Sequence, residues 1–282
     1  MKQKKLFIIL ASLGAFFGCS NVDTLYYNAK NCSNSSFGSS SYYGFRPMAN
    51  SLSVLVIGDS VQTIPSNAFS GCSGLSLVTL PGNLTDIGDG AFNNCTGLST
   101  ITLPDNLTRL GGSAFKGCSN LKTLNLPNNI TVLENYVFSG CKSLTSVTIP
   151  AKVTSIGQYT FEGCSGMTSI TFPASLTKIG ISAFSNCNNL KNVYIDDLAG
   201  WCRLSGLENL MKGEKHLFVK GKELEALVVP DGVTSIGNYA FLGCSGLTSI
   251  TIPNSVREIG WRAFDGCASL ENIAIPVMEV VE

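Results

Sequence analysis

The chain contains a single histidine, His216, among its 282 residues, and this scarcity excludes several kinds of chemistry. Ser–His–Asp and Cys–His nucleophilic sites use histidine as the base, and mixed zinc sites use it as a ligand. No Cys-x-x-Cys pair offers an alternative zinc motif. His216 itself lies in "KHLFV", which is typical of a strand residue near a turn. The sequence therefore predicts no catalytic residue, no metal and no cofactor.

Charge is scarce as well. Charged residues make up 13% of the chain, and 19 basic residues balance 19 acidic ones. Proteins that bind nucleic acid or anionic lipid electrostatically carry a basic excess, which is absent here. The acidic residues are scattered over turns, and the pair Asp196–Asp197 is more typical of the start of a short helix at "DDLAGWC" than of carboxylate catalysis. We expect neither an enzyme nor a nucleic-acid-binding protein.

Long hydrophobic runs are missing after residue 17. The one such run, residues 6–17, follows three lysines and is too short to span a bilayer but right for a signal peptide. It ends in "FFGCSN", which resembles the lipobox of bacterial lipoproteins, where the cysteine is acylated. We predict a lipoprotein signal peptide over 1–18 and lipid attachment at Cys19. The alternative is ordinary secretion with an unmodified Cys19.

These features predict a lipid-anchored protein of the bacterial cell envelope, at the outer membrane or cell surface, that touches the membrane only through its anchor. Residues 19–50 are rich in Ser, Asn, Gly and Tyr and show no apolar period. This composition predicts a flexible tether. In the alternative interpretation, its tyrosines cap the first repeat.

The chain has, in contrast, a regular repeat with a period of about 23 residues, within the range of leucine-rich repeats. Cysteines recur at this spacing, and each follows a phenylalanine by three residues. The cysteines of the repeat are Cys72, Cys95, Cys118, Cys141, Cys164, Cys187, Cys244 and Cys267. A fixed period in the twenties with a Leu-x-x-Ile-x-Leu core predicts a β-rich leucine-rich-repeat solenoid over residues 51–282. The repeat is interrupted by an irregular block at 189–222.

One coil, residues 143–165, shows the expected construction. A short strand ends at Pro150, because proline cannot donate to a sheet ladder, and a second short strand or turn follows. The positions expected to point inward are Leu144, Val147, Ile149, Val153, Ile156, Phe161 and Cys164. One coil cannot bury this apolar face alone, but neighbours stacked at about 4.8 Å can.

The motif "IPxxVTSIGxxAFxGCxxLTSITIP" resembles the Treponema pallidum type of leucine-rich repeat, found in the BspA-like family, and the resemblance covers residues 51–282. The segment 193–230 also resembles an irregular segment that recurs in that family. The resemblance implies a bacterial surface or secreted protein, and several family members are adhesins. It further implies a host or bacterial surface protein or glycan as the partner.

Eleven cysteines in an exported protein invite a disulfide framework. Equivalent residues of stacked coils, however, have nearly parallel Cβ vectors about 4.8 Å apart, whereas a disulfide needs converging vectors about 3.8 Å apart. We expect a ladder of buried thiols, with disulfides between some neighbours as the alternative. A bridge between Cys32 and Cys202, which lie outside the ladder, has no support in the sequence.

Two surfaces are candidates for ligand contact. The outward strand positions form a grid of short polar side chains, which is also what a β-sheet simply favours: Thr100, Thr102, Thr123, Asn125, Ser146, Thr148, Ser169, Thr171, Ser249 and Thr251. Residue types that dominate binding interfaces gather instead in the irregular block. They are Tyr194, Trp201, Arg203, His216 and Phe218. In the alternative interpretation, Trp201 and Phe218 fill the core where the repeat is interrupted.

The sequence thus predicts a cell-surface lipoprotein that acts as a binding module, an adhesin for host-matrix or neighbouring-cell macromolecules. The alternative is a structural or self-assembling surface spacer without a specific ligand.

Overall fold

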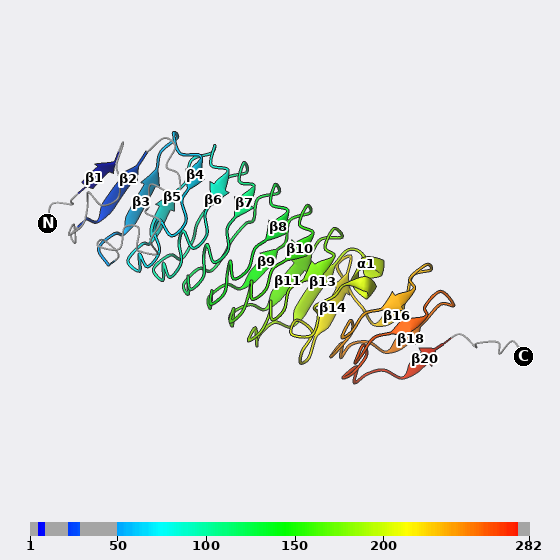
Figure 1. Cartoon of the computed structure of the whole chain (residues 1–282). Coiled ribbons are helices and arrows are strands. Elements are labelled where there is room, and N and C mark those ends of the chain that lie inside the picture. The colour runs from blue at the N-terminus through cyan, green and yellow to red at the C-terminus, as the bar shows by residue number, and fades with distance from the viewer. Residues whose placement is uncertain (1–4, 9–21, 29–49, 276–282) are drawn as a thin grey trace, which may run out of the picture.

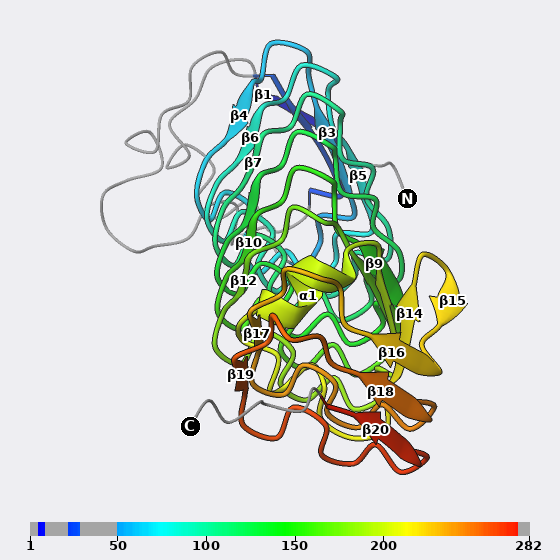
Figure 2. The same ribbon diagram turned by 90° about the vertical axis from the view of Figure 1, so that its right-hand side faces the viewer.

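The computed structural model describes residues 5–8, 22–28 and 50–275, and these form one elongated stack of coils (Figure 1). Each regular coil contributes one strand, or in two coils a single β-bridge, to a main sheet and a two-residue strand to a second sheet. The two sheets form opposite sides of the stack (Figure 2). This arrangement confirms the predicted leucine-rich-repeat solenoid with coils of about 23 residues.

The main face is built from parallel strands whose partners lie one repeat apart, as in the pairing of Ser146 with Ser169. From residue 54 on, and apart from β14 and β15, its strands are β3 (Val54–Ile57), β5 (Leu77–Thr79), β9 (Ser146–Thr148), β11 (Ser169–Phe172), β13 (Asn192–Ile195), β16 (Ala226–Val228), β18 (Ser249–Thr251) and β20 (Asn272–Ala274). Between β5 and β9, the bridge from Thr100 to Thr123 marks the same face.

The second face carries shorter strands, each with one buried residue in the coils before the last. They are β4 (Thr63–Ile64), β6 (Asp86–Ile87), β7 (Arg109–Leu110), β8 (Val132–Leu133), β10 (Ser155–Ile156), β12 (Lys178–Ile179), β17 (Ser235–Ile236) and β19 (Glu258–Ile259). The irregular block adds helix α1 (Leu198–Arg203), β14 (His216–Val219) and β15 (Lys222–Glu223).

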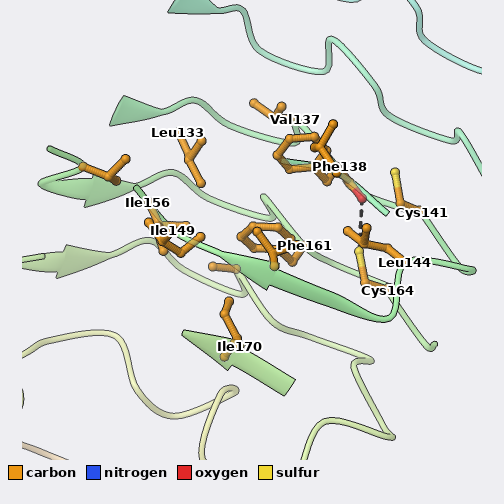
Figure 3. Packing of buried hydrophobic residues seen from close by; sticks show 14 of the residues in the cluster. Leu133, Val137, Phe138, Cys141, Leu144, Ile149, Ile156, Phe161, Cys164 and Ile170 are labelled. Atoms are coloured by element: carbon orange, nitrogen blue, oxygen red, sulfur yellow. Dashed lines mark hydrogen bonds between the residues drawn. The ribbon is translucent and has the colours of Figure 1, made fainter. Parts of the chain in front are cut away.

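Stacked phenylalanines form the centre of the core, one from each regular coil. The rings of Phe138 and Phe161 lie 5.5 Å apart between centroids, and those of Phe161 and Phe184 lie 5.2 Å apart. Beside them, the Cys164 thiol donates a hydrogen bond to the carbonyl of Phe138 (Sγ–O 3.2 Å; Figure 3). Each coil therefore buries its apolar side chains against the next one, as the repeat predicts.

The predicted flexible tether over residues 19–50 is wrong for the residues around 24–27. These residues form β2 (Thr24–Tyr27), which pairs in parallel with β3 as an additional strand of the main sheet. Leu25 and Tyr27 are buried, and the Tyr27 ring meets Phe69 edge-on at 6.2 Å. The alternative, in which tyrosines cap the first repeat, describes this segment, because alternation over four residues suffices to place two side chains on the inner face.

A further strand, β1 (Lys5–Ile8), pairs in parallel with β2. It falls within the predicted signal peptide of residues 1–18. Cys19, the predicted site of lipid attachment, lies outside the described residues, as does Cys32. In the described part of the chain, no helix is both long and apolar enough to cross a membrane.

Candidate binding surface

Helix α1 lies where a regular coil would carry its second strand. The chain enters from β13, turns through the helix and returns to the second face, where Ser205 bridges to Lys178. The next coil is fixed to the helix by a hydrogen bond from the Gly237 amide to the Cys202 carbonyl (2.6 Å). The short helix expected after the Asp196–Asp197 pair is thus present, and it continues the stack.

Trp201, predicted as a ligand contact, is buried in this helix with 3% of its surface exposed. Its indole Nε1–H donates to the Ala240 carbonyl at 2.8 Å. In regular coils, the equivalent carbonyl accepts from a phenylalanine amide of the preceding coil, as Ala91 does from Phe69 (2.8 Å). Because the irregular block supplies no such amide, Trp201 provides the missing donor. The prediction that Trp201 contacts a ligand is wrong, and the core-filling alternative is correct for it.

The strand after the helix, β14, pairs in parallel with β13 and then reverses into β15. The reversal is a two-residue turn at Lys220 and Gly221, with φ angles of 50° and 78°. Two consecutive positive φ values are typical of a type I′ turn, which matches the twist of a tight hairpin. The β14–β15 hairpin projects beyond the rest of the main sheet (Figure 2).

The hairpin brings Tyr194 and Phe218 together on the outer face of the main sheet. The two residues are paired across β13 and β14, and their rings stack with centroids 4.6 Å apart and planes 20° apart. Both side chains are half-buried. In the neighbouring strand, the residue paired with Tyr194 is Thr171. An aromatic pair therefore interrupts a row of short polar side chains.

His216 lies on the same face, two residues before Phe218. Its Nδ1 is 2.5 Å from the Glu223 Oε1 of β15, and both side chains are about one-third exposed. Glu223 is in turn paired with Phe218 in the hairpin. We call Tyr194, His216, Phe218 and Glu223 the hairpin patch.

Three of the five predicted contact residues thus meet in the hairpin patch, and two do not. Arg203 is exposed, but it lies at the end of α1, next to β17, and not on the main sheet. Trp201 is in the core. Sequence reasoning missed Glu223, whose partner His216 lies only seven residues away, a separation that any tight hairpin at Lys220–Gly221 would bring together.

A second aromatic stack was also missed. Tyr136 and Tyr159 stack with centroids 4.8 Å apart and planes 6° apart, and Lys116 Nζ lies 4.8 Å from the centre of the Tyr136 ring. Both tyrosines occupy the same left-handed turn position, with φ near 60°. The sequence signal for this stack is the spacing of one full repeat.

The nine cysteines of the described residues are free thiols. In the ladder, thiols donate to the phenylalanine carbonyl of the preceding coil, as Cys118 does to Phe92 (3.2 Å) and Cys187 to Phe161 (3.0 Å). Burial raises the pKa of Cys118 and of Cys187 to about 12. A thiol of this pKa is protonated at neutral pH, so the ladder residues behave as small apolar groups and not as nucleophiles.

Pockets for small ligands are poorly developed. A shallow depression beside α1 is lined in part by Phe172, Ile195, Asp197, Trp201 and Leu204 and is partly open to solvent. Asp197 is its one ionisable side chain. Within the described ranges, no three His, Cys, Asp or Glu residues are grouped to hold a metal ion.

The family model for the BspA-type leucine-rich repeat region matches this chain in six copies, over residues 11–122, 38–165, 131–199 and 213–281. Among solved structures, a leucine-rich cell surface protein of Faecalibacterium prausnitzii is 29% identical, with a TM-score of 0.54. The match covers 90% of this chain and 70% of that one.

Two other solved structures match over most of their length. A leucine-rich repeat protein of Bacteroides ovatus is 22% identical (TM-score 0.42), with 90% of this chain and 89% of that chain covered. The leucine-rich repeat protein of T. pallidum is 20% identical (TM-score 0.39), with 88% and 84% covered. No curated protein matches the sequence. BspA-like proteins are generally bacterial cell-surface proteins, and their solenoids are typically non-enzymatic binding scaffolds. The repeat, the fold and the family match together show that the chain belongs to the BspA-type leucine-rich repeat family.

Proposed function

We propose that this protein is a surface-displayed binding module, an adhesin that holds a macromolecule of the host matrix or of a neighbouring cell through the hairpin patch. The observation that carries the proposal is the stacked Tyr194–Phe218 pair, fixed on the outer face of a rigid sheet. Aromatic side chains of this kind dominate binding interfaces, whereas the neighbouring strands β11 and β9 offer short polar side chains at the paired positions Thr171 and Thr148.

Rigidity favours binding from this site. Tyr194 and Phe218 belong to neighbouring paired strands, and each ring limits the rotation of the other. Little side-chain entropy is lost when such a surface meets a partner. His216 and Glu223 place a hydrogen-bonding pair beside the rings, so the patch combines apolar area with polar groups at its border.

Attachment at Cys19 belongs to the same proposal. An acylated Cys19 would hold many copies on one cell, and multivalency would convert modest single contacts into firm adhesion. The proposed module has no enzymatic activity and no nucleic-acid partner, in keeping with its neutral charge balance.

The test is binding of the purified protein to immobilised matrix proteins and glycans, compared with the double variant Tyr194→Ser, Phe218→Ser. Expected is at least a tenfold loss of affinity for whichever target the native protein binds. The matched control is Tyr136→Ser, Tyr159→Ser, which removes a stacked aromatic pair elsewhere on the surface. Equal binding by the native protein and the hairpin-patch variant would contradict the proposal.

A second candidate, end-to-end assembly into a surface spacer, is favoured by a separate observation. In the last two described coils, Ile259, Ile273 and Ile275 expose 45%, 57% and 64% of their surface. Apolar areas of this kind mark association sites in other proteins. Sedimentation velocity over a hundredfold concentration range distinguishes the two functions, because assembly predicts growing species and binding alone predicts a constant monomer.

A further inference from the structure

The main sheet is interrupted inside the irregular block. One part has the strand order β15–β14–β13–β11–β9 and ends at the hairpin, and the other begins at β16 and continues through β18 to β20. β16 therefore pairs with β18 along one edge only. In Figure 1, β16 and its neighbours are set apart from β14.

The hydrogen bonds show which residues face the free edge of β16. Thr248 N–H donates to the Glu225 carbonyl (2.7 Å), and Val229 N–H donates to the Thr251 carbonyl (3.0 Å). Alternate residues of a strand direct their backbone groups to opposite sides. Since 225 and 229 face β18, the N–H and C=O groups of Ala226 and Val228 face away from it.

In other coils, the equivalent amide has an acceptor in the preceding coil. Leu77 N–H donates to the Ser53 carbonyl (3.1 Å), Asn192 N–H to that of Thr168 (3.1 Å), and His216 N–H to that of Lys191 (2.9 Å). Ala226 and Val228 have no such hydrogen bond within the described ranges. Their backbone groups are left available because β14, the strand to which β16 would otherwise pair, pairs with β15 instead.

Lys215 precedes β14 as Lys191 precedes β13, so its carbonyl is the one that an amide of β16 would be expected to meet. The Lys215 carbonyl accepts instead from the Ser245 amide (3.3 Å) of the following coil. His216 is the first residue of β14, and the next main-sheet strand after the hairpin, β16, begins ten residues later at Ala226. β14 and β16 consequently do not pair with each other.

The side chains along this edge suit an added strand. Val228 exposes 63% of its surface and Ala226 is exposed on the outer face, while Leu227 is buried in the core. Open strand edges are usually protected by charged side chains, prolines or bulges. None of the three residues of β16 is charged or is a proline.

We propose that β16 is a docking edge for an extended protein segment, which adds to the sheet as a strand and pairs with Ala226 and Val228. The proposal deepens the binding function proposed above and rests on it for the existence of a partner. The partner is a protein segment in β conformation, uncharged and rich in β-branched residues, because the strands that pair within the main sheet, such as SVT and SIT, have this composition. Only two residues separate Ala226 from Glu223 of the hairpin patch, so a docked segment would also reach the patch.

Amide hydrogen exchange of the full protein tests the free edge. We expect the amides of Ala226 and Val228 to exchange at least a hundredfold faster than those of Leu227 and Val229. Protection of all four amides to a similar degree in the free protein would overturn the proposal, because the edge would then already be covered.

Binding of strand peptides tests the docking. The probes are seven-residue peptides copied from this chain, beginning with Leu144–Pro150 (LTSVTIP), and a version of each with alternate amides N-methylated. Expected are saturable binding of the unmodified peptides, protection of Ala226 and Val228 in the complex, and at least a tenfold weaker affinity for the N-methylated ones. Absence of saturable binding by every peptide would overturn the proposal.

Proline substitutions locate the contact. Ala226→Pro and Val228→Pro each remove an amide that faces the free edge, so we expect peptide affinity to fall at least tenfold while the circular dichroism spectrum is retained. Leu227→Pro removes an amide that pairs with β18 and is expected to lower the unfolding temperature. Full peptide binding by folded Ala226→Pro and Val228→Pro variants would refute docking at β16. Glycan binding that leaves these amides exchanging freely would refute it too, while preserving the function proposed for the hairpin patch.

Discussion

The regular coils and the irregular block differ in the hydrogen bonds that join each coil to the next. In the regular coils, backbone amides and stacked phenylalanines connect each coil to the next, so the same hydrogen bond recurs once in every repeat. In the irregular block backbone bonds such as that from Gly237 to Cys202 persist, but at one position a side chain replaces a backbone amide, where Trp201 donates to the Ala240 carbonyl. The irregular block also inserts the β14–β15 hairpin into the main sheet, and this hairpin carries the candidate binding surface.

Lys215 illustrates the same substitution. It is 4% exposed, and its Nζ donates to the carbonyls of Lys212 (2.5 Å) and Glu214 (3.3 Å). Burial lowers its pKa, while Cys244 and Cys187, its neighbours in the thiol ladder, act in the opposite direction. A buried ammonium held by two carbonyls thus occupies the gap that the missing ladder cysteine would leave.

The largest effect should appear at alkaline pH, where the buried thiols of the regular coils outnumber the single one of the irregular block, Cys202. Burial raises the pKa of Cys72 and Cys118 to about 12, from an ordinary value of 9.0. Between these values the thiol ionises only in the unfolded chain, so folding is fully supported below pH 9 and loses support as the pH rises towards 12. Each such thiol lowers the free energy of unfolding by about 1.4 kcal/mol per pH unit in this window.

Because several ladder thiols contribute together, the free energy of unfolding measured in urea should fall steeply between pH 9 and pH 11. Cys118→Ala should reduce the slope by the contribution of one thiol. A free energy of unfolding that stays constant over this range, measured under reducing conditions, would show that the thiols are not protected as described.

The next largest effect concerns the phenylalanine stack. Phe138→Ala removes a ring that is stacked on both sides, at 6.0 Å and 5.5 Å, and should destabilise the protein by about 3–5 kcal/mol. Phe184 stacks on Phe161 and meets Phe172 only edge-on (5.9 Å), with no stacked ring on its other face, so Phe184→Ala should cost less, by about 0.5–1.5 kcal/mol. Chemical denaturation of both variants measures the difference. Equal costs would mean that the block supports its side of the stack as well as a regular coil does.

A smaller loss of stability is expected when Trp201, whose side chain replaces a backbone donor, is substituted. Trp201→Phe preserves an aromatic ring but leaves the Ala240 carbonyl without its donor, at a cost of about 1–3 kcal/mol. Trp261→Phe is the matched control, because Trp261 is 70% exposed and its replacement should leave the unfolding temperature unchanged. If both variants unfold with the native protein, the indole hydrogen bond does not support the stack.

The smallest effect belongs to the hairpin patch. Glu223→Gln weakens the contact with His216, a partly exposed pair that should contribute at most about 1 kcal/mol to stability. Thermal unfolding should therefore change little, and binding should change more. A large loss of stability would place the pair among the groups that hold the hairpin together.

The sequence predicted the repeat and its inward positions well, because the same residue types recur at equivalent positions of successive coils. An ambiguous residue in one coil can therefore be assigned from its equivalents in the others. Phe161 and Cys164, read from one coil, are both fully buried. Prediction was less successful for Trp201 and for residues 24–27, where no repeat helps. A single tryptophan in an irregular segment reads equally well as a contact or as core, and four residues of alternation are hidden by the polar residues around them.

By itself, the sequence determined the coil length, the core and the family, since a fixed period of this length allows one stacking geometry in which every apolar face is covered. It also indicated the region where the candidate contact residues Tyr194, His216 and Phe218 gather. Only the tertiary structure decided that Tyr194, His216 and Phe218 meet on the main sheet, that Trp201 turns inward and that β16 keeps a free edge. These outcomes depend on how one coil pairs with the next, and such pairing between distant residues is fixed by packing and hydrogen bonds that no local pattern records.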